Sequence, residues 1–239
     1  MKKNEYTLTD AAKFTVSESY KMARTNILFS ISTSDKHTVV FTSCSSHEGK
    51  STTCINIAIS LGKAGKKTLL IDCDLRKPTV HRRLKISNPN GLANAICGFC
   101  TVDEAINRDV GENLDVITSG TIPPNPAELL ASESMAEILA EMQKKYEIIL
   151  IDMPPVDVVI DSQLLNQYIS GIVFIVKEGS TTHTDIRESL RKIELADGKV
   201  LGMIKTSCVP RGSRRRRGNY NGAYLTYSSA QKNSEASDK

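Results

Sequence analysis

Residues 43–52, SCSSHEGKST, end in a Gly-Lys-Ser-Thr tetrad that has the form of a phosphate-binding loop. The run before it is strand-like and the run after it has apolar residues at helical spacing, which predicts a strand over Thr38–Thr42 and a helix over Lys50–Lys63. At such a turn the backbone N–H groups and the helix N-terminus receive phosphate oxygens, the lysine reaches the terminal phosphates, and a hydroxyl binds Mg²⁺. The pattern therefore predicts nucleotide binding through Ser46, His47, Glu48, Gly49, Lys50, Ser51 and Thr52, with Ser51 as a magnesium ligand.

Two further strand ends carry carboxylates. LLIDCDLRKP, residues 69–78, places Asp72 and Asp74 after an apolar run, with Arg76 close behind, and IILIDMPP, residues 148–155, places Asp152 in the position of a Walker-B aspartate. Carboxylates at such places coordinate a magnesium ion or its water shell, or accept a hydroxyl proton during phosphoryl transfer. The alternative for the first pair is a solvated strand end with an N-cap aspartate. The candidate catalytic residues are Lys50, Asp72, Asp74 and Asp152, and the candidate metal ligands are Ser51, Asp72 and Asp152.

The elements that must position these side chains follow from the apolar pattern. Strands alternate with helical segments, which favours an α/β fold with a mainly parallel sheet and helices on both faces. In such sheets the binding site lies at the carboxyl ends of the strands, where all three motifs fall. An amphipathic helix is expected over Val16–Ser32, packed on the body. The predicted strands are Thr38–Thr42, Thr68–Ile71, Leu114–Ile117, Ile148–Ile151, Gly171–Val176 and Val200–Ile204.

Length and composition are those of an ordinary globular protein: 239 residues, 40% hydrophobic and 24% charged. They predict one domain with tails. No apolar run approaches the roughly 20 residues of a membrane span, and the N-terminus has no apolar core, so neither a spanning helix nor a secretory signal is expected. The six scattered cysteines fit a reducing cytoplasm. Cys97 and Cys100 form a CxxC pair with no second pair nearby, which favours small apolar residues near a turn over a metal or redox site.

The basic charge of the chain is concentrated at its end. Residues 211–239 hold seven positive and two negative side chains, a net +5, whereas the whole chain has +4. The body is therefore close to neutral, and no nucleic-acid-binding surface is indicated. Arg, Gly, Ser and Asn dominate this stretch, so a disordered tail is expected from about residue 209. Arg214–Arg217 allow three interpretations: contact with an anionic membrane surface, contact with an acidic partner, or a solubilising charge run.

With these residues assembled, the chain resembles the bacterial tyrosine kinases (BY-kinases), specifically the separate cytoplasmic kinase subunit of capsule and exopolysaccharide systems in Gram-positive bacteria. LLIDCDLRKP resembles the family's extra aspartate motif, ILIDMPP its Walker-B motif, and Pro123–Leu130 a further family stretch, PPNPAELL. ESYKMARTN is similar to the N-terminal pattern ExxRxxR-Thr-Asn, with Glu18, Lys21 and Arg24 in the three key places. The resemblance covers nearly the full length and implies a P-loop NTPase fold of the deviant Walker A, MinD-like type.

The resemblance also implies an activity. It predicts an ATP- and Mg²⁺-dependent protein-tyrosine kinase that phosphorylates Tyr220, Tyr224 and Tyr227 of its own tail in trans, with other proteins as further candidate substrates. Residues 1–36 are expected to form a helical segment for contacts in a homo-oligomeric ring through Glu18, Lys21 and Arg24, residues 37–208 the kinase domain, and residues 209–239 the tyrosine-bearing tail. A transmembrane adaptor of the polysaccharide co-polymerase type is expected to recruit this cytoplasmic chain to the inner face of the membrane and to activate it.

Four positions depart from the family pattern. Ser46 and His47 stand where the family usually has Pro-Gly, and glycine is favoured where φ is positive or the backbone meets a phosphate closely. Histidine tolerates positive φ better than most residues, and a cationic imidazole favours phosphate. Lys21 replaces an arginine and lacks its planar fork. Thr206 falls where the family commonly places an asparagine near the base.

Two other classes of protein compete with this interpretation. A partition- or division-type ATPase switch shares the loop and the sheet, but its defining early lysine is Ser45 here. A degenerate kinase subunit that acts as an interaction protein is favoured only by His47, because all the charged residues expected to do chemistry are present.

Overall fold

The structure is a computed structural model of the chain, and it describes residues 10–156 and 167–207. The described residues form a seven-stranded sheet of order β3-β4-β2-β5-β1-β6-β7. All neighbouring strands are parallel except β3 and β4, which pair antiparallel. The strands are β1 (Thr38–Ser43), β2 (Thr68–Asp72), β3 (Ile106–Gly111), β4 (Leu114–Ile117), β5 (Ile148–Asp152), β6 (Gly171–Lys177) and β7 (Val200–Thr206).

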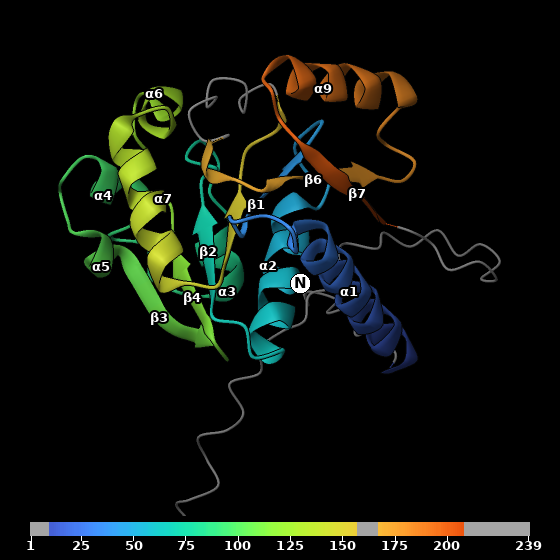
Figure 1. Ribbon diagram of the computed structural model, residues 1–239, viewed down its shortest axis with the longest axis horizontal. Helices are drawn as coiled ribbons and strands as arrows, with labels where there is room; N and C mark the ends of the chain where they lie inside the picture. Colours follow the sequence, from blue (N-terminus) through green and yellow to red (C-terminus); the bar gives the residue numbers. More distant parts are fainter. Residues whose placement is uncertain (1–9, 157–166, 208–239) are drawn as a thin grey trace, which may run out of the picture.

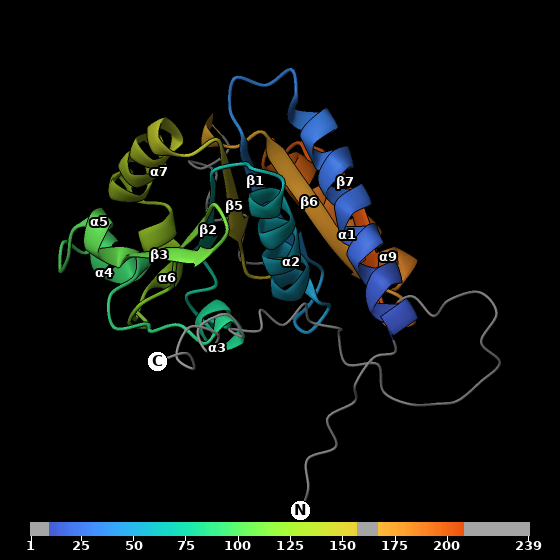
Figure 2. The same ribbon diagram turned by 90° about the horizontal axis from the view of Figure 1, so that it is seen from below.

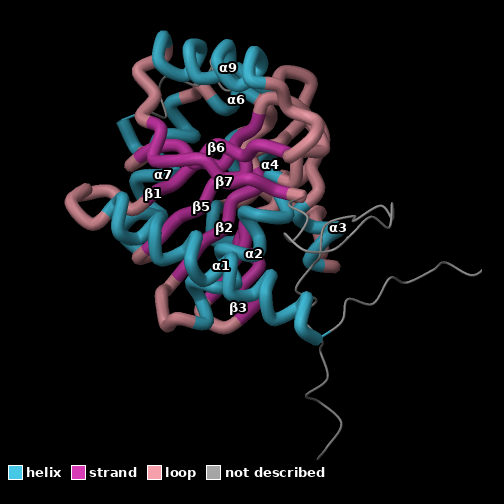
Figure 3. The backbone as a smooth tube through the Cα atoms, turned by 90° about the vertical axis from the view of Figure 1, so that its right-hand side faces the viewer, coloured by secondary structure: helices cyan, strands magenta, loops and turns pink. Residues whose placement is uncertain are grey.

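Helices cover both faces of the sheet, as Figure 1 and the tube view of Figure 3 show. The side chains of each strand alternate between two apolar clusters: Val39 and Phe41 of β1 pack with α1 and α2, while Val40 packs on the opposite side, in the cluster that includes α7. The fold is therefore a three-layer α/β/α arrangement. The described helices are α1 (Asp10–Ile31), α2 (Lys50–Lys63), α3 (Val80–Leu84), α4 (Leu92–Ile96), α5 (Val102–Ala105), α6 (Pro126–Leu130), α7 (Glu133–Lys145) and α9 (His183–Leu195).

The α/β class and all six predicted strands are confirmed, and α2 begins and ends at the predicted residues. The sequence did not predict β3, which lies at one edge of the sheet. Its middle residues, Arg108 and Asp109, are exposed, and Asp109 has a φ of 52°, so the strand shows neither an apolar run nor a clean alternation. The pairing with β4 is irregular between Asn107 and Gly111. Edge strands of this kind give a weak sequence signal.

The N-terminal helix α1 lies alongside α2, as Figures 1 and 2 both show. Ile27 and Ile31 are buried, and Tyr20 and Ala23 pack against the same cluster, which confirms the predicted apolar stripe. The helix is longer than predicted at its N-terminal end. It thus braces the helix that follows the phosphate-binding loop. None of the described helices combines the length and apolar character that crossing a bilayer demands.

Gly62, in the last turn of α2, allows this helix to approach the turn before β4. A Cβ at this position would lie 2.0 Å from the carbonyl oxygen of Glu112, which is backbone and cannot move aside cheaply. Gly62→Ala is therefore expected to lower the free energy of unfolding by about 2 kcal/mol or more, although alanine normally favours a helix. Urea unfolding measures the change. Gly202→Ala is the matched control, because a Cβ there meets nothing within 4 Å; equal effects of the two substitutions would refute the close approach.

Candidate active site

Three loops meet at the carboxyl ends of the strands because β2, β5 and β1 are consecutive in the strand order. Asp72 and Asp152 are register partners at the ends of β2 and β5, and Phe41 of β1 is level with Asp152. The loop that follows β1 therefore begins beside both aspartates. The structure brings together the phosphate-binding loop and the two carboxylate motifs, which lie far apart in the sequence.

The phosphate-binding loop enters α2 without a side-chain cap. Gly49 occupies the N-cap position with a φ of 93° and gives no side-chain hydrogen bond to the first amides of the helix. By contrast, Ser132 caps α7 and Thr182 caps α9 through their hydroxyls. The amides at the start of α2 are left to a ligand, and a helix N-terminus favours an anion. This is the arrangement that phosphate oxygens need.

His47 lies within this loop with a φ of 65°, in the left-handed region. This is the position at which the sequence analysis expects glycine to be favoured. Ser46 and His47 are exposed, whereas Lys50, Ser51 and Thr52 are buried at the start of α2. The histidine therefore carries a backbone conformation that costs more for it than for glycine, while its ring remains in solvent.

The side chain of Glu48 stabilises the loop through hydrogen bonds within the protein. Its side chain is buried, with 4% exposed, and its Oε2 accepts a hydrogen bond from the Ser45 amide at 2.9 Å. Its Oε1 accepts a hydrogen bond from the hydroxyl of Thr181, in the turn between β6 and α9. Glu48 is one of the predicted nucleotide-binding residues, but its side chain is hydrogen-bonded within the protein. It can therefore meet a phosphate only through its backbone amide.

The end of β7 also holds the loop. The hydroxyl of Thr206 donates to the Glu48 carbonyl at 2.7 Å, and its methyl group would lie 3.3 Å from a Cβ on Gly49. Lys177, at the end of β6, donates from Nζ to the His47 carbonyl at 3.3 Å. Two strands thus fix the backbone of the loop. Thr206 falls where the family commonly places an asparagine near the base, and here its side chain contacts the loop.

Lys50 forms a buried ion pair that connects α2 with β5. Its Nζ lies 2.9 Å from Asp152 Oδ1 and 3.5 Å from Asp74 Oδ2. Burial by itself lowers the pKa of Lys50, but the charges of Asp152 and Asp74 outweigh burial and raise it above its usual value. The lysine is therefore a fixed cation beside the uncapped end of α2.

Asp72 is completely buried, and its two oxygens hold the following loop. Oδ1 accepts from the Asp74 amide at 3.2 Å and Oδ2 from the Val80 amide at 3.1 Å. Burial first, and then the charge of Asp152, raise the pKa of this carboxyl to about 7. Asp74 is less buried, with 15% of its side chain exposed, and it accepts from the Lys77 amide. Asp74 is thus the carboxylate of this pair that a substrate can reach.

One carboxylate oxygen in the site has no protein partner. Oδ2 of Asp152 is buried and accepts no hydrogen bond from any described residue. Such an oxygen costs free energy unless a cation or water meets it, and carboxylate and hydroxyl oxygens suit Mg²⁺. Within the part of the chain that the structure describes, no cluster of three His, Cys, Asp or Glu side chains suffices to hold a metal alone. The residues therefore fit a magnesium ion that shares its coordination with Ser51, Asp152, water and phosphate oxygens.

Arg83 of α3 is a neighbour of the site that the sequence did not predict. Its Nη1 donates to the Thr52 hydroxyl at 2.9 Å and its Nε to the Thr79 hydroxyl at 3.2 Å. Burial lowers the pKa of its guanidinium. Arg83 thus connects the segment after β2 with the first turn of α2. No local pattern in VHRRL predicts this contact.

The residues predicted for subunit contacts divide into two groups. Glu18 and Lys21 are exposed on α1 and pair with each other at 2.8 Å, so they are open to a neighbouring subunit. Arg24 turns inward and donates from Nη1 to the carbonyl and hydroxyl oxygens of Ser60, on α2, at 3.0 and 3.3 Å. The predicted acceptors Tyr220, Tyr224 and Tyr227 lie outside the described residues, as do Arg214–Arg217.

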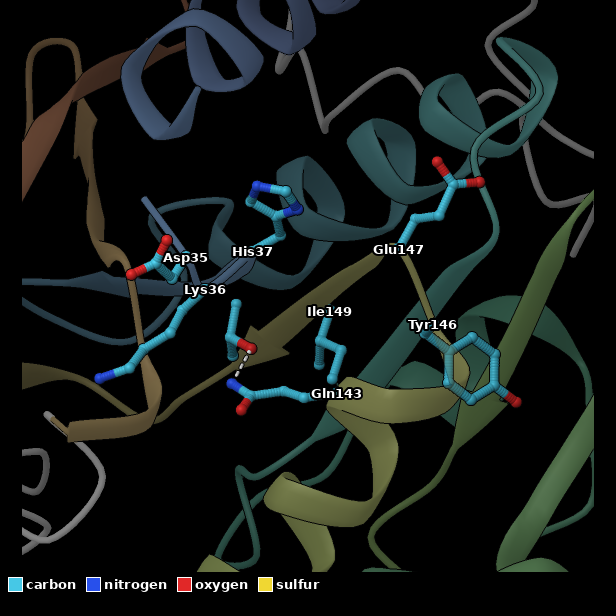
Figure 4. Close-up of a pocket in the computed structure, with 8 residues that line it drawn as sticks. Asp35, Lys36, His37, Gln143, Tyr146, Glu147 and Ile149 are labelled. Carbon is cyan, nitrogen blue, oxygen red and sulfur yellow. Dashed lines mark hydrogen bonds between the residues drawn. The ribbon is translucent and has the colours of Figure 1, made fainter. Parts of the chain in front are cut away.

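A hollow lies at the opposite end of the strands from the aspartates, around the start of β1 (Figure 4). Gln143 crosses it and donates from Nε2 to the Thr38 hydroxyl at 2.9 Å and to the Tyr168 carbonyl at 2.6 Å. The amide therefore joins α7 to β1 and to the segment before β6. This hollow is remote from the aspartates, and its hydrogen bonds have a structural role.

Comparison with known proteins points to one family. Residues 39–194 match the family model described as an AAA domain. The chain is 37% identical to the tyrosine-protein kinase YwqD of Bacillus subtilis (strain 168) over 204 residues, covering 85% of this chain and 86% of that protein. It is also 37% identical to the putative tyrosine-protein kinase CapB of Staphylococcus aureus over 195 residues, covering 82% and 86% of the two chains.

Solved structures agree with these relatives. The kinase domain of the Escherichia coli tyrosine kinase ETK superposes with a TM-score of 0.78 at 26% identity, over 85% of this chain and 80% of that one. The septum site-determining protein MinD of Pyrococcus horikoshii superposes with a TM-score of 0.59 at 21% identity, over 70% and 69%. The second match shows that the fold is of the MinD-like P-loop type, as predicted.

The pKa of Asp72 makes stability depend on pH. Because it lies at about 7 in the folded chain and at 3.8 in its ordinary state, the stabilising contribution of Asp72 is complete below about pH 4 and is lost as pH rises to about 7. Between pH 5 and pH 8, wild type is expected to lose roughly 2–3 kcal/mol of unfolding free energy relative to Asp72→Asn. Urea unfolding at both pH values checks this, with the exposed Asp197→Asn as control. A pH-independent difference between wild type and Asp72→Asn contradicts it.

The backbone at position 47 gives a second prediction. His47→Gly is expected to leave ATP affinity unchanged or to raise it by no more than a few-fold, because the ring contributes little and the φ of 65° costs glycine nothing. His47→Val is expected to weaken ATP binding about tenfold, since β-branched residues disfavour this conformation strongly. Isothermal titration with ATP and Mg²⁺ measures both. Equal affinities for the glycine and valine variants would show that the loop does not need this backbone conformation.

Proposed function

The chain belongs to the bacterial tyrosine-protein kinase family, and we propose that it transfers the γ-phosphate of ATP to tyrosines in the tail of a neighbouring copy. The observation that carries the proposal is the convergence of Lys50, Asp74 and Asp152 on the uncapped end of α2. A cation, two carboxylates and free helix amides at one point are the parts that phosphoryl transfer uses.

Binding of ATP releases Lys50 from its carboxylates. The β- and γ-phosphates accept hydrogen bonds from the amides of the loop and from the Nζ of Lys50, which lies 2.9 Å from Asp152 in the structure. Ser51 and Asp152 would hold Mg²⁺, which would neutralise charge on the phosphates. Release from Lys50 leaves both oxygens of the Asp152 carboxylate open to such a cation.

In the transfer step, the tyrosine oxygen bonds to the γ-phosphorus while the bond from this phosphorus to the β–γ bridging oxygen breaks. The products are phosphotyrosine and ADP. The phenolic proton passes to a carboxylate, and we assign this role to Asp74, because part of its side chain is exposed. Asp72 holds the loop through the Asp74 and Val80 amides. It is therefore a positioning residue that also raises the negative potential at the metal.

The acceptor assignment comes from the sequence. Tyr220, Tyr224 and Tyr227 lie within eight residues of each other in a tail with a net +5 over residues 211–239. We propose that this tail, residues 209–239, reaches the site of another copy. The phosphates, each near −2, then reverse the charge of the tail and alter assembly.

Assembly and recruitment complete the proposal. Residues 1–36 provide subunit contacts in a ring, with Glu18 and Lys21 exposed for this purpose, and residues 37–208 form the kinase domain. A transmembrane adaptor recruits the chain to the inner face of the membrane and completes the nucleotide site. Relatives include the tyrosine-protein kinase Wzc of Salmonella typhi, of which this chain spans 27% at 30% identity. We propose that this kinase regulates capsule or exopolysaccharide synthesis.

A mixing experiment tests transfer in trans. One full-length chain carries Tyr220, Tyr224 and Tyr227 changed to Phe and keeps its active site; the other carries Lys50→Met and keeps its tyrosines. With labelled ATP, Mg²⁺ and the adaptor's cytoplasmic segment, each chain alone is expected to remain unlabelled, and the mixture to label the Lys50→Met chain. The lysine substitution should reduce transfer at least 100-fold, because it removes a fixed charge at the phosphates.

The outcomes separate the competing functions. ATP hydrolysis by wild type without phosphotyrosine, with and without the adaptor segment, would favour an ATPase switch. Failure of wild type to bind ATP would favour an interaction protein. Labelling of wild type alone but not of the mixture would show that transfer occurs within one chain.

A further inference from the structure

A cluster of exposed cations lies beside the active site and has no part in the chemistry described so far. Residues 75–88 contain no carboxylate, and their arginines and lysines follow directly on the aspartate loop. Among these, four side chains project into solvent. We call them the α3 basic surface: Arg76, Lys77, Arg82 and Lys85.

This surface is fixed to the reacting centre by three hydrogen bonds. The Val80 amide, at the start of α3, donates to Asp72, and Arg83 donates to Thr52 in the first turn of α2. The Lys77 amide donates to Asp74. Since α3 has five residues, its far end lies roughly 7 Å from its start. A short peptide can therefore contact these exposed cations while one of its tyrosines lies at the Asp74 carboxylate.

The charges of the α3 basic surface are not neutralised by the protein. Across residues 10–156 and 167–207, none of its four side chains forms an ion pair; Arg82 donates from Nη2 to the Pro78 carbonyl at 2.8 Å, which leaves its charge intact. Clustered charges of one sign at the rim of a site attract ligands of the opposite sign. The ligand expected here is an anion that arrives together with the substrate tyrosine.

We propose that the α3 basic surface binds a phosphotyrosine already formed on the tail of a second copy, and so presents the next tyrosine of that tail to the site. This inference rests on the proposed function, in which the tail is the substrate. The spacing fits: Tyr220 and Tyr224 are four residues apart, which is roughly 13 Å in an extended chain. A phosphate on one tyrosine thus reaches α3 while the other stands at Asp74.

The charge of the tail selects this occupant. The unphosphorylated tail has a net +5 over residues 211–239, with Arg214–Arg217 close to Tyr220, so the α3 basic surface repels it. A phosphate of about −2 next to the acceptor reverses the interaction. An anionic membrane is the competing occupant of a basic surface, but a bilayer seated on α3 would cover the approach to Asp74. Phosphorylation of the tail therefore becomes easier after the first phosphate.

A binding experiment tests the docking without requiring transfer. The full-length chain, with Tyr220, Tyr224 and Tyr227 changed to Phe, is loaded with Mg²⁺ and a non-hydrolysable ATP analogue. Fluorescence anisotropy then compares two peptides of residues 218–230 that both keep Tyr220 and both carry Tyr227→Phe. The first, the phosphorylated peptide, has phosphotyrosine at position 224, and the second, the control peptide, carries Tyr224→Phe. We expect the phosphorylated peptide to bind about five- to tenfold more tightly, and the difference to shrink in high salt.

Two variants assign the effect to this surface. Arg82→Gln/Lys85→Gln is expected to abolish the preference for the phosphorylated peptide, while Arg191→Gln/Lys199→Gln, which removes the same charge within α9 and just before β7, is expected to keep it. Lys85→Gln alone serves if the double variant unfolds. A preference that is absent in wild type, or that survives equally in Arg82→Gln/Lys85→Gln, overturns the proposal. Loss of binding to anionic vesicles, with peptide binding unchanged in that variant, assigns the surface to a membrane and overturns it too.

Kinetics with the same peptides distinguishes this inference from the proposed function. With ATP, Tyr220 of the phosphorylated peptide should be phosphorylated with a kcat/KM about five- to tenfold above that of the control peptide, and Arg82→Gln/Lys85→Gln should equalise the two at the lower value. Equal rates in wild type overturn the docking and leave the kinase function intact. No transfer to either peptide, with tight binding of the phosphorylated one, would instead contradict the tail as substrate.

Discussion

The buried ion pair between Lys50 and Asp152 is the interaction on which the site depends. It joins the first residue of α2 to the last residue of β5 at 2.9 Å, in a place where both residues are buried. Removing one partner of such a pair typically costs about 3–5 kcal/mol, because the other charge is left buried alone. Asp72, on the neighbouring strand β2, adds a further carboxyl to those of Asp152 and Asp74. Burial and the charge of Asp152 raise its pKa to about 7. The site is thus arranged to receive additional positive charge.

The phosphate-binding loop gains its shape from distant parts of the chain. Glu48 is held by Thr181, and its carbonyl by Thr206, so the segments after β6 and at the end of β7 fix a loop that follows β1. Because these contacts satisfy the loop without using the first amides of α2, the helix end stays open to phosphate. The described part of the chain ends at Ser207, directly after Thr206, whose hydroxyl contacts the phosphate-binding loop.

The sequence predicted what local patterns encode. The bounds of α2 and the positions of six strands follow from apolar runs with sharp ends, and the carboxyl-end rule placed Lys50, Asp74 and Asp152 together. Long-range contacts carry no such signal. No local pattern predicts the hydrogen bond between Glu48 and Thr181, or the one between Arg83 and Thr52. The complete burial of Asp72 depends on strand order, which periodicity does not give.

We propose that Lys50 changes partners when ATP binds. A crystal structure of the full-length chain with Mg²⁺ and a non-hydrolysable ATP analogue measures this directly through the distance from Lys50 Nζ to Asp152 Oδ1, which is 2.9 Å in the present structure. We expect this contact to open, Nζ to meet the terminal phosphates, and Asp152 to face the metal. A Lys50 that stays paired with Asp152 while the nucleotide is bound would contradict it.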